Sequence, residues 1–177
     1  MKPLAFILLF SITMTSTPIF NFTKEANISN WRIVDDVVMG GRSNGNFELN
    51  KDGHGVFSGK VSLENNGGFS SLRYITETID IARNTKVCIK LKGDGKNYQF
   101  RIKADRNQRY SYITTFKTSG EWETITINLK ELYPAFRGRT LNYPNFDKTT
   151  IEELAFLIGN KKAEDFKLLI DSITLEK

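Results

Sequence analysis

The chain has 177 residues, a formal net charge of +5 and a single cysteine. This length suits one domain with a sizeable core, and one thiol excludes an intramolecular disulfide framework. Lys and Arg are interspersed with Asp and Glu along the chain, and no nucleic-acid-binding module is recognisable. The basic balance therefore does not predict nucleic-acid binding.

Residues 1–22 have the features of a secretory leader. Lys2 precedes an apolar run from Leu4 to Ile12 that is too short to span a bilayer. We interpret the segment as a signal peptide, or as an N-terminal anchor that associates with a membrane if it is left uncleaved. A mitochondrial transit peptide is usually rich in Arg, whereas residues 1–30 contain none. We therefore expect an exported or periplasmic protein of the cell envelope.

From Trp31 onward, short segments alternate apolar and polar residues, and turn signals separate them at close intervals. Such a pattern is typical of a sandwich or barrel. It predicts one all-β domain over residues 28–177, a jelly-roll β-sandwich of about eight to ten strands with little helix. Residues 133–148 contain two prolines and several aromatics, which predicts a long ordered loop, and such loops are often functional.

Three glycine-rich reversals punctuate the predicted strands. Glycine permits positive φ and close approach of two backbones, and a neighbouring Asp or Asn can bond backbone groups that a turn leaves unpaired. We interpret Asp35 and Asp36 as scaffolding of the first reversal, with direct ligand contact as the alternative. The predicted structural residues of the turns are Gly40, Gly41, Asn65, Asn66, Gly67, Gly68, Gly93, Asp94 and Gly95.

The order of these motifs resembles the complex I intermediate-associated protein family. The resemblance rests on DDVVMGGRS at 35–43, SLENNGGF at 62–69, SLR at 71–73, GDGKNY at 93–98 and FRGR at 136–139. It implies a galactose-binding-like β-sandwich and a role in assembling respiratory complex I. It brings no catalytic mechanism with it.

Catalytic chemistry has little support in the sequence. His54 is the single histidine and lies between two glycines, so neither a His-based zinc site nor a Ser-His-Asp constellation is expected. Asp35 and Asp36 are adjacent, and an extended backbone would point them to opposite faces, which makes a glycan hydrolase the weakest alternative. Calcium suits carboxylates in turns, but no dense ligand spacing is found. We expect no enzyme, no cofactor and no metal site.

Binding is the function class that remains, and it rests on aromatic and planar polar side chains. Tyr and Trp can stack on sugars or pack on a protein, although each aromatic can instead belong to the core, while Arg and Asn supply directional hydrogen bonds. The candidate binding residues are Asp35, Asp36, Arg73, Asn97, Tyr98, Arg101, Tyr110, Tyr112, Trp122, Arg137 and Arg139. We hypothesise a non-catalytic assembly or chaperone-type factor that binds a protein partner, or alternatively an exported carbohydrate-binding module.

Overall fold

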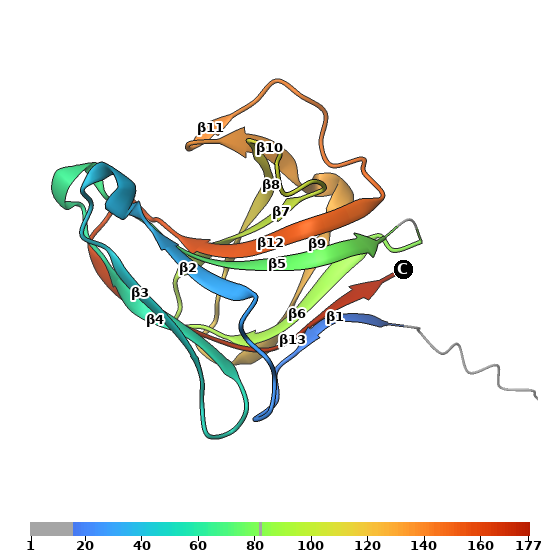
Figure 1. Cartoon of the computed structure of the whole chain (residues 1–177), viewed down its shortest axis with the longest axis horizontal. Helices are drawn as coiled ribbons and strands as arrows, with labels where there is room; N and C mark the ends of the chain where they lie inside the picture. Colours follow the sequence, from blue (N-terminus) through green and yellow to red (C-terminus); the bar gives the residue numbers. More distant parts are fainter. Residues whose placement is uncertain (1–15, 82) are drawn as a thin grey trace, which may run out of the picture.

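The computed structural model describes residues 16–81 and 83–177, which form two antiparallel sheets packed face to face (Figure 1). This architecture confirms the predicted all-β sandwich with little helix. Within the described residues, no helix is long and apolar enough to cross a membrane. The helical elements of this part of the chain are the single turns η1 (Asp36–Met39), η2 (Glu64–Asn66) and η3 (Leu129–Glu131).

Two sheets of different size make up the sandwich. The six-stranded sheet contains, in spatial order, β3 (Asn44–Leu49), β4 (Gly55–Val61), β13 (Glu164–Glu176), β6 (Lys86–Lys92) and β9 (Trp122–Asn128), with β1 (Thr17–Asn21) paired to β13. The seven-stranded sheet contains β11 (Arg139–Thr140), β10 (Tyr133–Phe136), β8 (Ser111–Lys117), β7 (Asn97–Lys103), β12 (Thr150–Ile158), β5 (Ser70–Asp80) and β2 (Trp31–Asp35).

The described residues form 13 strands, more than the eight to ten expected, because short strands were not foreseen at the N-terminal side and at one sheet edge. The first of these, β1, leads into Phe22, which is 6% exposed and packs its ring 5.3 Å from that of Trp31. The sandwich therefore begins at Thr17, before the predicted boundary at residue 28. The remainder of the predicted leader, residues 1–15, lies outside the described residues.

The core lies between the two sheets and is built by alternation along each strand. On β7, Tyr98, Phe100 and Ile102 are at most 1% exposed, while the residues between them face away from the core. A strand with one apolar and one polar face places its apolar side on a core. This alternation, visible in the sequence, fixes which face of each sheet turns inward.

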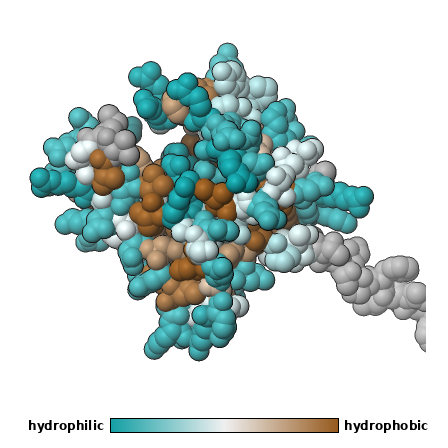
Figure 2. Space-filling model, in the orientation of Figure 1, coloured by the Kyte–Doolittle hydropathy of each residue, from teal (hydrophilic) through white to brown (hydrophobic). Residues whose placement is uncertain are grey.

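Strand β12 departs from this alternation because it is buried on both faces. Leu154 and Phe156 face the core, yet Glu153, Ala155 and Leu157 on the opposite face are only 5%, 3% and 8% exposed. Figure 1 shows that the sheet curls, with β7, β8 and β10 rising from the level of β12 and β5. We call the outward side of this sheet the concave face; the space-filling view shows it hollowed (Figure 2), and we call this hollow the groove, with β12 as its floor.

The turns η1 and η2 stand on one side of this face, and β10 and β11 rise on the other side of it (Figure 1). We call residues 133–148, which contain β10 and β11, the arm. The space-filling view shows the surface hollowed between these two walls, with apolar and polar atoms side by side in the hollow (Figure 2).

Candidate ligand-binding face

The first glycine-rich reversal is organised by the carboxylate of Asp36, which is 5% exposed. It accepts hydrogen bonds from the Ser43 hydroxyl at 2.6 Å and from the backbone N–H groups of Gly68 at 2.6 Å and Phe69 at 3.2 Å. Burial alone would raise the pKa of Asp36, but these hydrogen bonds outweigh it and hold the pKa below its usual value. Asp35 accepts from the N–H of Gly45 at 2.9 Å. Asp36 therefore scaffolds the turns at η1 and η2, and Asp35 ties the end of β2 to the start of β3.

The second reversal uses its residues differently from the expectation. Asn65 and Asn66 take the left-handed conformation, with φ of 53° and 60°, whereas Gly67 has φ of −66°. At position 67 glycine is needed because there is no room for a side chain: a Cβ there would lie 2.6 Å from the Asp36 Oδ2 atom. The Asn65 side chain also donates to the Gly40 carbonyl at 2.9 Å, which ties the two reversals together.

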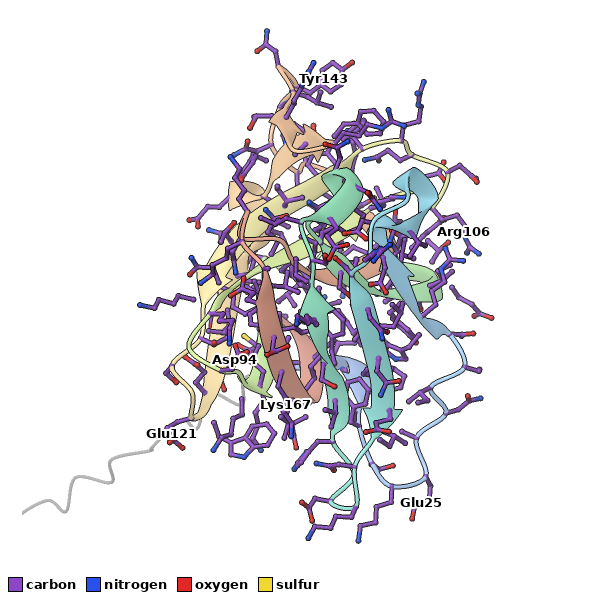
Figure 3. The ribbon with its side chains drawn as sticks, turned by 90° about the vertical axis from the view of Figure 1, so that its left-hand side faces the viewer. Glu25, Asp94, Arg106, Glu121, Tyr143 and Lys167 are labelled. Carbon is purple, nitrogen blue, oxygen red and sulfur yellow. The ribbon has the colours of Figure 1, made fainter. Side chains whose placement is uncertain are left out.

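The third reversal is held by Asp94 in the turn between β6 and β7. Its carboxylate accepts from the Tyr98 hydroxyl at 3.1 Å, the Lys96 ammonium at 2.7 Å and the Lys167 N–H at 2.9 Å. Figure 3 places Asp94 and Lys167 side by side at this end of the sandwich. All three reversals thus act as structural turns.

The predicted aromatic binding residues do not form one surface. Tyr98 and Tyr112 are 1% and 2% exposed and belong to the core, because alternation places both on the inward face of their strands. Tyr110 packs against this core. Trp122 is 40% exposed, but it lies on the outward face of the other sheet, with its ring 4.6 Å from that of His54.

The candidates that the fold does bring together are Arg73 and Arg101. The register of the central strands pairs Arg32 of β2 with Arg73 of β5, Arg73 with Ala155 of β12, and Ala155 with Arg101 of β7. One residue from each of four neighbouring strands thus forms a line across the concave face. We call Arg32, Arg73, Ala155 and Arg101 the arginine row; it continues through Ile113 on β8 to Tyr133 on β10.

The charges of this row are not balanced by carboxylates. Arg101 donates from Nε and Nη2 to the Gln99 amide oxygen, at 3.0 and 2.6 Å. Burial, with a further contribution from Arg73, lowers the pKa of Arg101 to about 10. On the same face, Glu153 is already paired with Lys103 at 3.4 Å. Among the described residues, no ion pair joins either Arg73 or Arg101 to an acidic side chain.

Sequence reasoning missed Arg32, Gln99, Tyr133 and Ala155 as members of this face. Their alignment depends on the pairing of β5 with β12, strands about 80 residues apart in the chain, and such register is not readable from one sequence. One signal was available: residues 154–158 form a continuous apolar run, which is typical of a strand buried on both faces.

The predicted loop at residues 133–148 contains the β10–β11 hairpin. Arg137 and Gly138, with φ of 48° and 76°, form its turn, and the Arg137 guanidinium lies 5.3 Å from the centre of the Phe136 ring. Beside it is an open pocket of about 450 Å³, lined by Arg109, Tyr110, Phe136, Leu141 and Tyr143. Tyr143 is 59% exposed and points away from the sandwich (Figure 3). Arg137 and Arg139 are exposed, whereas Asn97 lies at the exposed start of β7.

Groups suited to catalysis or metal binding are sparse in the described part of the chain. No three His, Cys, Asp or Glu side chains converge there to hold a metal ion. His54 lies 3.3 Å from Asp171, beside Trp122. Cys88 is 7% exposed, and burial raises the pKa of its thiol, which makes it a poor nucleophile.

Comparison with known proteins gives a family and a fold. The model of the family described as Complex I intermediate-associated protein 30 (CIA30) matches residues 20–170. An uncharacterized protein of Schizosaccharomyces pombe is 29% identical over 166 residues, which cover 81% of this chain and 76% of that protein.

Among solved structures, a family 11 carbohydrate-binding module from Clostridium thermocellum, in complex with a β-1,3-1,4-mixed-linked tetrasaccharide, is similar with a TM-score of 0.67. It is 17% identical, and the match covers 90% of this chain and 94% of the module. The agarase AgWH50C matches with a TM-score of 0.58 and 13% identity, over 92% of this chain and 24% of the agarase. These likenesses show that the chain has the jelly-roll fold of carbohydrate-binding modules.

Proposed function

Because the chain belongs to the Complex I intermediate-associated protein 30 family, we propose that it is a non-catalytic binding protein that holds a protein partner in the groove of its concave face. The family's name supports a partner encountered during assembly of respiratory complex I. The fold, which is also that of carbohydrate-binding modules, supports a binding role without catalysis.

The recessed floor of the concave face is the observation that carries this proposal. The outward side of a central strand in a sandwich is normally wet, yet Ala155 and Leu157 on β12 are almost fully buried by their neighbours. A trough with a buried floor and two raised walls matches the shape of an extended chain. Polar groups beside this floor, Gln99 and Arg101 on β7, can orient such a chain through hydrogen bonds.

A protein fits this groove better than a neutral sugar. Sugar binding relies on exposed aromatic faces for stacking, and two of the four predicted aromatic candidates, Tyr98 and Tyr112, lie in the core. The row across the groove presents arginines in their place. Arg is among the residues enriched at protein–protein interfaces, where its planar group both packs and donates hydrogen bonds.

Filling the groove tests the proposal. In Ala155→Phe the new ring would project from the floor of the groove and block an extended partner. A matched control is Ser58→Phe, at an outward position of β4 on the opposite sheet. Tagged wild type and both variants would be used for affinity capture from native membrane and envelope fractions, and captured proteins would be identified by mass spectrometry. We expect complex I subunits with the wild type and the control, and their loss with Ala155→Phe.

Equal capture by all three proteins, with unchanged circular-dichroism melting curves, would refute binding in the groove. An Ala155→Phe protein that melts well below the control would be replaced by Ala155→Leu, a smaller obstruction at the same position. That variant separates blocked binding from lost folding.

Glycan binding is the second candidate, favoured by the shared fold with a module solved in complex with a tetrasaccharide. The most exposed candidates for stacking lie outside the groove, at Trp122 and Tyr143, which are 40% and 59% exposed, whereas Tyr133 on the concave face is half-buried. A glycan array would test this candidate. Binding that disappears in Trp122→Ala or Tyr143→Ala, and persists in Ala155→Phe, would support it in place of the protein-binding role.

A further inference from the structure

We propose that Arg73 and Arg101 form a carboxylate-binding site, so that the partner segment held in the groove is acidic. This inference rests on the proposed function, because it assigns a ligand chemistry to the same groove. It is carried by the geometry of the arginine row, by the absence of an internal counter-charge among the described residues, and by the apolar side chains beside the row.

The strand register places the two arginines on either side of one small residue. Arg73 and Arg101 both pair in register with Ala155, one on each side, so their Cα atoms are two strand spacings apart, or about 10 Å. The intervening side chain is a single methyl group, and its neighbours leave it 3% exposed. The side chain at this position therefore does not rise between the two arginines, so both can reach one ligand from the two sides of β12.

Arg101 also keeps free donors that suit a carboxylate. Its Nε and Nη2 atoms both donate to one oxygen of Gln99, and no acceptor among the described residues engages Nη1. The two terminal nitrogens of a guanidinium form a fork that can bond both oxygens of a carboxylate in parallel. The fold thus orients Arg101 through Gln99 and leaves the end of the fork for a ligand.

The electrostatics of the free protein favour an anion at this place. Arg101 is partly buried and lies near the like charge of Arg73, and both effects lower its pKa. A desolvated cation without an acidic partner is costly, and an incoming carboxylate would offset that cost. The Lys103–Glu153 pair beside it has no net charge, so it leaves the cationic character of the row intact.

The surroundings of the row favour an acidic peptide over an anionic polysaccharide. Neighbouring positions on the same face are apolar: Val34 on β2, Leu157 on β12 and Ile113 on β8. A peptide can place apolar side chains on these residues and carboxylates on the arginines, because alternate residues of an extended chain share a face. A polyuronate has carboxylates but no apolar side chains to pack there.

Fluorescence anisotropy with defined probes tests the assignment. The probes are a labelled ten-residue peptide with Glu and Val in turn at the odd positions and Ser at every even position, its counterpart with Gln in place of Glu, and a labelled pentagalacturonate. We expect the Glu peptide to bind at least tenfold more tightly than the Gln peptide, with affinity that falls as salt is raised. Arg73→Gln and Arg101→Gln should each weaken binding about tenfold, whereas Arg83→Gln, at an exposed position between β5 and β6, should not.

The outcomes distinguish failure of the carboxylate site from failure of partner binding in the groove. Equal binding of the Glu and Gln peptides, or no binding of the Glu peptide, would overturn the carboxylate site. Tighter binding of pentagalacturonate than of the Glu peptide would overturn the peptide assignment in favour of an acidic glycan. If Ala155→Phe abolishes partner capture while both Arg→Gln variants retain it, the groove stands and the carboxylate site falls. If none of these substitutions affects capture, both proposals fail.

Discussion

At the scale of single residues, Asp36 shows how a buried carboxylate can serve folding rather than chemistry. Its two oxygens accept from one hydroxyl and from the backbone of two segments, at Ser43 and at Gly68 and Phe69. Hydrogen bonding, the structural alternative to a catalytic or metal-binding role, accounts for its lowered pKa. These hydrogen bonds join the turns at η1 and η2 through a single carboxylate.

Asp36→Asn is expected to lower the free energy of unfolding by about 2–3 kcal/mol at pH 7, because the amide loses one acceptor oxygen and leaves buried N–H groups unpaired. The contribution of the carboxylate is fully present above its unfolded pKa, near 3.8, and disappears as pH falls through the lower folded pKa. Urea unfolding of both proteins at pH 7 and at acid pH checks this. The gap between them should narrow in acid; a constant gap would contradict the role of the charge.

At the scale of elements, the reversals at η1 and η2 can pack closely because a glycine, which has no side chain, stands where carbonyl and carboxylate groups converge. At Gly67 a Cβ would lie 2.8 Å from the Ser62 carbonyl as well as 2.6 Å from Asp36 Oδ2. The backbone there has negative φ, so crowding rather than left-handed geometry excludes larger residues. The motif SLENNGGF is thus a packing requirement of two turns in contact.

Gly67→Ala should therefore lower the free energy of unfolding by about 2 kcal/mol, since overpacking of a tight site typically costs 1–3 kcal/mol. Gly95→Ala is a useful comparison, because a Cβ there meets nothing within 4 Å and only its φ of 81° is unfavourable. Thermal melting of both variants would test the difference. A Gly67→Ala protein as stable as the wild type would show that the turn relaxes at little cost.

The sequence predicts the faces of single strands but not which strands pair. The alternation along β7 correctly assigned Tyr98, Phe100 and Ile102 to the inward face and their polar neighbours to the outward face. That assignment is enough to predict a strand of a sandwich. The site depends on longer-range facts. Arg73 and Arg101 lie on the same line because β12 pairs with both β5 and β7. Only that register places Ala155 between the two arginines. Local patterns carry no information on this pairing.

At the scale of the whole molecule, the two sheets present unlike outer surfaces. The outward positions of the six-stranded sheet are largely solvated, with Lys90, Trp122 and Lys167 among them. The seven-stranded sheet curls and hides its outward positions along β12. This asymmetry gives the molecule one recessed face, and β1 completes the opposite sheet by pairing with the long strand β13.

The two walls of the groove differ in how firmly they are held. The wall at η1 and η2 is fastened by Asp36 and by the bond from Asn65 to Gly40. The opposite wall ends in β11, which has two residues and lies at the edge of the sheet.

Amide hydrogen exchange reports local opening, so amides of residues 133–140 should exchange faster than those of Gly68 and Phe69, and a bound partner should slow the exchange at residues 133–140. The groove would then adjust its width from the arm side, which would let one fixed wall set the position of a partner while the mobile wall adapts to its size.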